Sequence, residues 1–314
     1  MAMFEEAYIS KLHVDQIIGG GVSPLIRKTR YLDAANGSNG NNGTTPDLAV
    51  KTLASALAKI TTGKGDKIVL VGGASSLSLA ANPAWSYNQT ILAGNSTGMM
   101  NQRARIGQSV TFTPFFTVTG YGNTFAGLAF YHGAADTDLI GVQLSGNGNR
   151  NSFYNCHFHP QVGEIVNKTV YVNGVSETYF NNCAFGNNTV NYTSNGALLW
   201  LGQGNGITIC DNCIFVIRSS NGASYFIYLD NTTDTGLLIL RNCMFIGDMA
   251  GVAIVEGIKI ASNGAGRVIL DSQCQFVNVT DITNDSTDQY IYPAVPGYSA
   301  SMNAEYKATV LVQS

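Results

Sequence analysis

Acidic side chains are the first candidates for chemistry in this sequence of 314 residues. Hydrolysis of a glycosidic bond uses two carboxyl groups held about 5 to 9.5 Å apart. Asp230 and Glu256 would fall about five strand positions apart on neighbouring strands, a separation of about 16 Å. The candidates are Asp136, Asp138, Glu164, Glu177, Asp211, Asp230, Asp234, Asp248, Glu256 and Asp271. Asp136 and Asp138 belong to a stretch typical of a solvated turn, so the sequence predicts no catalytic pair and no enzymatic activity.

Cysteine and histidine could instead bind a metal. Residues 210–213, Cys-Asp-Asn-Cys, have the spacing of a zinc knuckle, but no second pair of Cys or His completes four ligands. His157 and His159 alternate with Cys156 and Phe158, which places the two histidines together on one face of a strand. No clustered aspartates, phosphate loop or dinucleotide motif accompanies them. We therefore expect neither a metal nor a cofactor. The arginines Arg150, Arg218, Arg241 and Arg267 are isolated in the sequence, and we expect ordinary surface roles for them.

A short phrase, Asn-Cys-x-Phe, repeats along the chain. It occurs at 155–158, 182–185, 212–215 and 242–245, recurs every 27 to 31 residues, and has a degenerate copy at 273–276. A weaker copy at 127–130 has Leu128 in place of the cysteine. A period in this range, carried by short strand-forming segments, is typical of a solenoid.

The phase of the phrase predicts what each residue does. Cys and Phe, two positions apart, share one face of a strand, which the repeat requires to be the interior. Asn is the commonest residue other than glycine at positive φ, so an Asn before each strand predicts a left-handed bend. We expect the cysteines to be buried free thiols. A continuous stack of rings should run through Phe130, Phe158, Phe185, Phe215, Phe245 and Phe276.

Counting forward from each Phe locates a second strand in every repeat. Positions twelve and fourteen residues later are apolar and predicted to face inward, for example Val170 and Val172. The intervening residues should then face outward, and they are unusually apolar: Tyr171, Leu198, Trp200, Phe226 and Tyr228. A contiguous apolar patch on a protein surface marks an interface or a ligand groove. These five residues are the candidate contacts with another subunit or with carbohydrate.

Composition excludes several classes of function. Only 12% of residues are charged and 35 are glycine, as expected for a tightly turning, β-rich protein. The net charge of −3 argues against a nucleic-acid partner. No apolar run approaches the length of a membrane span, so no membrane association is expected. The acidic start, with Glu5 and Glu6, does not resemble a signal peptide, and we expect synthesis in a cytoplasm without export.

The chain divides into four predicted parts. Residues 1–30 lack the repeat and are predicted to be a docking arm, with candidate contacts Phe4, Tyr8, Leu12, Ile17 and Ile18. Residues 31–66 hold a first strand and, after Thr45 and Pro46, a capping helix from Asp47 to Ile60. The solenoid occupies 67–285, and 286–314 is a C-terminal cap or an intersubunit strand. A cap is expected because the end of a solenoid would otherwise expose its core.

Residues 31–40, Tyr-Leu-Asp-Ala-Ala-Asn-Gly-Ser-Asn-Gly, together with 43–46, 51–57 and 65–70, resemble the first segment of pectin-lyase-like proteins. The resemblance covers residues 31 to 285 and implies an all-β, right-handed, single-stranded parallel β-helix. In that superfamily the segment precedes polysaccharide-active enzymes and virion proteins of tailed bacteriophages. It therefore implies a structural virion protein, assembled in the bacterial cytoplasm, that decorates or cements the capsid through its N-terminal arm.

The expected oligomer is a homotrimer that contacts capsid or other virion proteins. The alternative is a tailspike or receptor-binding protein that binds or cleaves polysaccharide of the host surface. In the first case the outward aromatic residues would form a subunit interface. In the second, Tyr171, Trp200 and Tyr228 would stack on sugar rings.

Overall fold

A computed structural model provides the coordinates. It describes residues 27–293 apart from 74, 96–103, 109, 111, 133–139, 161–167, 193–195, 205, 221, 231–235, 249–250, 262–265 and 283–290. The predicted docking arm, apart from residues 27–30, and the C-terminal segment from residue 294 lie outside the described residues. Within the described part of the chain, no helix is long and apolar enough to cross a membrane.

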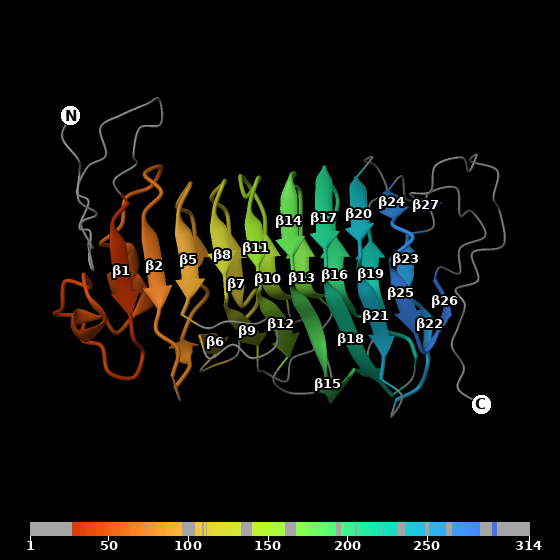
Figure 1. The fold of residues 1–314 in the computed structure, drawn as a ribbon, viewed down its shortest axis with the longest axis horizontal. Coiled ribbons are helices and arrows are strands. Elements are labelled where there is room, and N and C mark those ends of the chain that lie inside the picture. Colours follow the sequence, from red (N-terminus) through yellow and green to blue (C-terminus); the bar gives the residue numbers. More distant parts are fainter. Residues whose placement is uncertain are drawn as a thin grey trace, which may run out of the picture.

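The described residues form a right-handed parallel β-helix, which confirms the predicted fold class (Figure 1). Each complete coil among the described residues contributes a strand to sheet A, then to sheet B, then to sheet C, and every paired strand is parallel to its neighbours. The sheets therefore run the length of the solenoid, and each coil packs on the coils before and after it.

Sheet A contains the strands that precede the Asn bends. Its strands are β1 (Thr29–Leu32), β2 (Lys67–Leu70), β5 (Ile91–Gly94), β8 (Thr124–Ala126), β11 (Ser152–Tyr154), β14 (Thr178–Asn181), β17 (Ile207–Asp211), β20 (Leu237–Arg241), β24 (Arg267–Leu270) and β27 (Ile291–Pro293). Sheet B contains the strands that follow the bends. They are β3 (Leu77–Leu79), β6 (Arg105–Gln108), β9 (Ala129–His132), β12 (His157–Pro160), β15 (Ala184–Tyr192), β18 (Ile214–Ser219), β21 (Met244–Gly247) and β25 (Gln275–Val277).

Sheet C completes each coil. Its strands are β4 (Ala84–Trp85), β7 (Phe116–Val118), β10 (Ile140–Leu144), β13 (Lys168–Val172), β16 (Ala197–Leu201), β19 (Tyr225–Leu229) and β23 (Ile258–Ile260). A small fourth sheet in the last coils pairs β22 (Ile254–Glu256) with β26 (Val279–Asp281).

The predicted phenylalanine stack runs through the core beneath sheet B. From Phe130 to Phe276, each ring stacks on the next with centroids 4.5 to 5.4 Å apart and planes within 25° of parallel. The predicted stack is confirmed. Sheet A supplies a second column that the repeat did not reveal, with Phe125, Phe153 and Phe180 stacked at 4.8 and 5.0 Å. Edge-to-face contacts such as Phe153 with Phe158 join the two columns.

The corner between sheets A and B is built from the Asn and Cys of the phrase. Asn155, Asn182, Asn212 and Asn242 have φ between 47° and 54°, which confirms the left-handed bends. Their side chains form hydrogen-bonded pairs, with Asn242 Nδ2 donating to Asn212 Oδ1 at 2.6 Å. All six cysteines are free thiols, and only Cys274 is partly exposed. Each corner thus satisfies its polar groups while placing the sulfur in the core.

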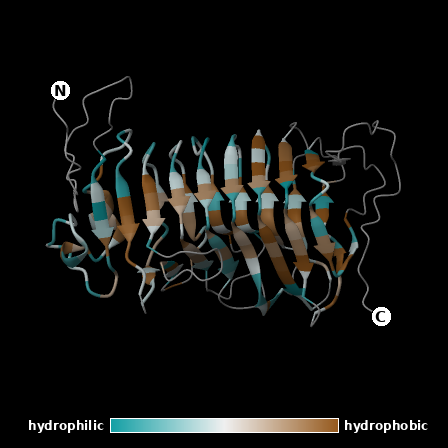
Figure 2. Ribbon diagram, viewed as in Figure 1, coloured by the Kyte–Doolittle hydropathy of each residue, from teal (hydrophilic) through white to brown (hydrophobic). Residues whose placement is uncertain are grey.

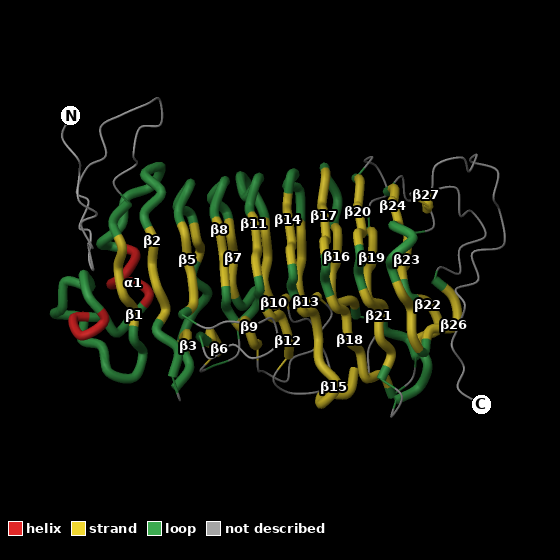
Figure 3. Tube along the Cα trace, viewed as in Figure 1, coloured by secondary structure: helices red, strands yellow, loops and turns green. Residues whose placement is uncertain are grey.

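The N-terminal cap is shorter than predicted. A 3₁₀ turn at Pro46–Leu48 and a helix α1 at Leu53–Leu57 replace the single helix from 47 to 60 (Figure 3). Between them Val50 is extended and donates its N–H to Tyr31 O at 2.9 Å, because it forms a parallel bridge with β1. Backbone pairing with the first strand therefore outweighs helix propensity here. Leu53, Ala56 and Ile60 are buried, whereas Leu48 is 43% exposed.

Candidate binding face on sheet C

Three of the five predicted outward residues form a continuous aromatic column on the outer face of sheet C. Tyr171, Trp200 and Tyr228 lie directly opposite one another on β13, β16 and β19. All three are half-buried. The rings of Trp200 and Tyr228 meet edge to face with centroids 4.2 Å apart. The same register continues to Gln143 before the aromatic column and to Lys259 after it.

Two lysines complete this face. Lys168 Nζ lies 4.3 Å from the centroid of Tyr171 and 4.4 Å from that of Trp200, close enough for cation–π attraction to both rings. Lys259 Nζ forms an ion pair with Glu256 Oε2 at 3.1 Å. The Glu256 residue is only 4% exposed, so the ion pair anchors the lysine beside Tyr228. This face of sheet C therefore combines the apolar surface of aromatic rings with two positively charged groups in fixed positions.

Both tyrosines of the column stay protonated at neutral pH. Burial raises the pKa of Tyr171, and the negative charge of Asp230 raises it further. Burial and Asp230 also raise the pKa of Tyr228, although Lys259 opposes them. Their phenol groups can thus donate and accept hydrogen bonds but are poor nucleophiles.

A glycine leaves room for the ring of Tyr171 on the outer face of the sheet. A Cβ atom at Gly202 would lie 2.7 Å from both Cε2 and Oη of Tyr171 and 2.8 Å from Oδ1 of Asn173. The tyrosine ring therefore extends over the end of the neighbouring strand, into space that a side chain at 202 would occupy. Residue 202 thus helps to determine the position of the ring.

Leu198 and Phe226 were predicted to face outward, and this prediction is wrong. Both are fully buried at 0% exposure. They follow the corner between sheets B and C, where the residue pairing skips one position in each strand and strict alternation is lost. Phe226 packs against Phe245 with ring centroids 5.5 Å apart. Leu198 lies over Gly186, whose missing side chain leaves room for it. These two residues belong to the core.

The two histidines share one face of a strand as predicted, and that face is largely covered. His157 and His159 lie on the outer side of β12 but are largely buried, with ring centroids 4.3 Å apart. His157 Nε2 is 2.8 Å from Gly186 O, and His159 stacks on Tyr131. His132, 2% exposed, has no hydrogen-bond partner among the described residues on either ring nitrogen. Burial lowers the pKa of all three, to about 3 for His132 and about 4 for His159.

Two of the described carboxylates adjoin the aromatic face: Asp230 raises the pKa of Tyr171 and Tyr228, and Glu256 is paired with Lys259. Asp211 is paired with Arg241 on the outer face of sheet A. Glu256 and Asp281 lie opposite each other on β22 and β26, a pairing that the sequence did not predict. Among the described residues, no three His, Cys, Asp or Glu side chains converge on a position for a metal ion.

Sequence reasoning also missed the two lysines of the face. The repeat phase assigned importance to apolar residues alone, so it passed over Lys168 and Lys259. The available signals were the three-residue step from Lys168 to Tyr171 and the 31-residue step from Tyr228 to Lys259, which matches the length of one coil.

Comparison with known proteins supports the fold class alone. No family model and no curated protein matches the sequence. The structure is nevertheless that of the right-handed, pectin-lyase-like parallel β-helix.

Among solved structures, a pectin methylesterase from Aspergillus niger is similar at a TM-score of 0.58 and 13% identity, over 88% of each chain. A pectin methylesterase variant in complex with a hexasaccharide has a TM-score of 0.55 and 12% identity, over 81% of this chain and 88% of the other. A rhamnogalacturonan lyase has a TM-score of 0.52 and 15% identity, over 80% of this chain and 68% of the other. At such identities the likeness extends to the fold and not to the activity.

Proposed function

We propose that this chain is an oligomeric β-helical virion protein of a tailed bacteriophage that binds polysaccharide of the host surface through sheet C. The observation that carries the proposal is the alignment of Tyr171, Trp200 and Tyr228 on three consecutive strands. Aromatic rings with a polar edge suit a ligand that has both apolar faces and hydroxyl groups. Binding sites of this kind combine aromatic surface with a few fixed polar groups.

The parallel strands suit an extended ligand. Aromatic residues on neighbouring coils repeat about every 4.8 Å along the solenoid. A chain molecule that lies along the solenoid axis would meet Tyr171, Trp200 and Tyr228 in turn, with Lys168 and Lys259 at its side. Solved proteins of this fold include one in complex with a hexasaccharide, which supports a saccharide as the ligand class.

Binding without turnover is the role that this face favours. Its tyrosines have raised pKa values, and Glu256 is bound to Lys259. Solved proteins of this fold include esterases and lyases, so the experiment below also measures catalytic turnover. Decoration of the capsid through the arm rests on residues 1–30, of which 1–26 lie outside the described residues, and it stays a prediction of the sequence. The trimeric state also stays a prediction.

Binding of the full chain to purified capsular and lipopolysaccharide fractions, measured by calorimetry, tests the proposal. Trp200→Ala should weaken binding about tenfold, because one desolvated aromatic contact contributes about 1.4 kcal/mol. Tyr154→Ala on the outer face of sheet A is the matched control, and it should bind like the wild type.

The same incubations should be analysed for cleaved or de-esterified saccharide. Product formation would replace the binding role with an enzymatic one. Equal binding by the wild type and Trp200→Ala, or no binding to any surface polysaccharide, would contradict the proposal.

A further inference from the structure

The outer face of sheet A carries a second apolar surface, on different strands and of different chemistry. Five aliphatic residues lie side by side across β17, β20 and β24, and we call them the aliphatic strip: Ile207, Ile209, Leu237, Ile239 and Ile269. Ile207 is 40% exposed and the other four are partly exposed. Figure 2 shows the predominantly hydrophobic colour of β17 and β20, in contrast to the mixed colour of β14. A contiguous apolar face shared by three strands is a candidate contact with another molecule.

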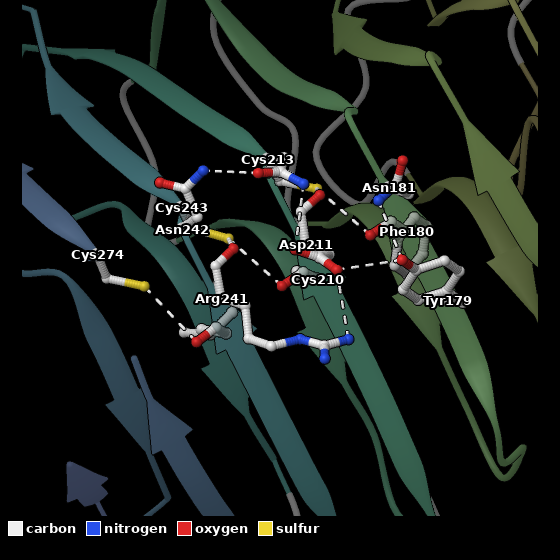
Figure 4. A network of polar contacts seen from close by, with 12 residues as sticks. Tyr179, Phe180, Asn181, Cys210, Asp211, Cys213, Arg241, Asn242, Cys243 and Cys274 are labelled. Atoms are coloured by element: carbon white, nitrogen blue, oxygen red, sulfur yellow. Dashed lines mark hydrogen bonds and ion pairs between the residues drawn. The ribbon is translucent and has the colours of Figure 1, made fainter. Parts of the chain in front are cut away.

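Charged residues border the strip along both of its edges. At the C-terminal ends of the strands, Asp211 Oδ2 lies 3.3 Å from Arg241 Nη2 and accepts a hydrogen bond from Tyr179 Oη at 3.2 Å (Figure 4). At the opposite ends, the register places exposed Glu177, which forms an ion pair with Arg150 of the same chain, before Ile207 and exposed Arg267 after Leu237. Each edge therefore has a negative residue toward β14 and a positive residue toward β24.

We propose that the aliphatic strip is a two-fold contact with a second copy of this chain. The axis would run parallel to the strands, between β17 and β20, so that β17 faces β20 of the second copy and β14 faces β24. Asp211 then lies opposite Arg241 of the second copy, and Glu177 opposite Arg267 of the second copy. Between these two charged edges, Ile209 meets Ile239 of the second copy.

The arrangement of charged and aliphatic residues favours a second copy of this chain as the partner. A two-fold contact brings the same surface of both subunits together, so the surface must match itself. Here one rotation brings opposite charges together at both edges and aliphatic side chains together between them. The contact would remove the aliphatic strip from water, which favours association. The edge charges would mainly fix the register, since exposed ion pairs contribute little free energy.

This contact goes beyond the proposed function and differs from the trimer predicted by resemblance. A three-fold assembly joins two different surfaces at each contact and has no need of a self-matching strip. The contact uses sheet A and does not include Tyr171, Trp200 or Tyr228, which lie on sheet C. Polysaccharide binding and self-association can therefore fail independently.

Charge reversal provides the test, with the mass of the full chain measured by sedimentation. The wild type should be a dimer. Asp211→Arg and Arg241→Asp should each be monomeric over the concentrations at which the wild type dimerises, because like charges would face each other, and association should weaken at least tenfold. An equimolar mixture of the two variants should form a heterodimer, since opposite charges then meet again.

Two further variants separate the contact from changes in folding. The combined Asp211→Arg, Arg241→Asp variant should dimerise like the wild type. Lys67→Asp is the control: it reverses a charge on β2 of the same sheet, outside the strip, and should leave the dimer unchanged. A monomeric or trimeric wild type, a dimer that survives both single reversals, or a mixture that stays monomeric would overturn the proposal.

Discussion

The interior beneath sheet B and the outer face of sheet C follow opposite rules, although the same coils build both. Inside, one coil after another places a phenylalanine on the ring of the coil before it, from Phe130 to Phe276. Outside, the equivalent position changes from Gln143 to Tyr171, Trp200, Tyr228 and Lys259. Stacking requires matched neighbours inside the solenoid, whereas an outer residue is free to serve a ligand. Repetition along this chain therefore marks the residues of the core, whereas the outer position on sheet C varies from coil to coil.

The largest expected effect comes from breaking the interior stack. Phe215→Ala removes a fully buried ring that lies 4.5 Å from Phe185 and 4.8 Å from Phe245. The cavity and the lost contacts should lower the free energy of unfolding by about 3 to 5 kcal/mol. Denaturation in urea measures the change.

Trp200→Ala is the matched substitution on the outer face. Because Trp200 is half-buried, its loss should lower the free energy of unfolding by about 1 kcal/mol. Equal losses in Phe215→Ala and Trp200→Ala would show that the outer column is as structural as the inner one.

Acid should produce the next largest effect, and it acts on the histidines of sheet B. The folded protein keeps His132 neutral, with its pKa at about 3 owing first to burial and then to the charge of His159. An unfolded histidine titrates near pH 6.5, so acid protonates the unfolded chain at this position before the folded protein. The free energy of unfolding therefore keeps its full value above pH 6.5 and falls as the pH drops toward the pKa of the folded protein. His132 alone should account for a loss of about 3 kcal/mol between pH 7 and pH 4.

Urea denaturation at a series of pH values measures how steeply the free energy of unfolding falls with pH in the wild type and in His132→Leu. The variant should lose less stability on acidification, because His157 and His159 are the described histidines that remain to be protonated. A slope identical to that of the wild type would place the acid sensitivity elsewhere. Arg105 contributes in the same direction, since its positive charge lowers the pKa of His159.

Features that recur in every coil could be predicted from the sequence, whereas features confined to one or a few coils could not. The Asn bends, the free cysteines and the phenylalanine stack were predictable because each position recurs with the period of a coil. The column of Phe125, Phe153 and Phe180 covers only three coils before Cys210 takes its place, too few to reveal a period.

Strict alternation also failed at the corners. It placed Leu198 and Phe226 outside, although the backbone turns there and both side chains enter the core. The position of Lys168 over two rings depends on side-chain conformation, which no spacing rule supplies. The cap was misjudged for a related reason, since the pairing of Val50 with β1 is a tertiary contact.

A smaller effect is expected at the left-handed bends. Asn212 has a φ of 54° and accepts a hydrogen bond from Asn242. Asn212→Ala should cost about 1 to 2 kcal/mol, because an ordinary side chain is strained in this conformation. Asn212→Gly should cost less, since glycine adopts positive φ freely. If both variants were equally destabilised, the hydrogen-bonded ladder rather than the backbone conformation would account for the role of Asn.

The smallest effect on stability should come from a glycine on the outer side, and it distinguishes the two regions most sharply. A Cβ at Gly202 meets mainly the distal atoms of the Tyr171 ring, which can move, so Gly202→Ala should cost less than about 1 kcal/mol. A Cβ at Gly186, by contrast, would lie 2.1 Å from the backbone oxygen of Val216 at a φ of 79°, and Gly186→Ala should be far more destabilising. Displacement of Tyr171 should nevertheless weaken saccharide binding in Gly202→Ala, as measured by calorimetry. Unchanged binding would mean that Tyr171 tolerates movement and that Trp200 and Tyr228 form the essential part of the face.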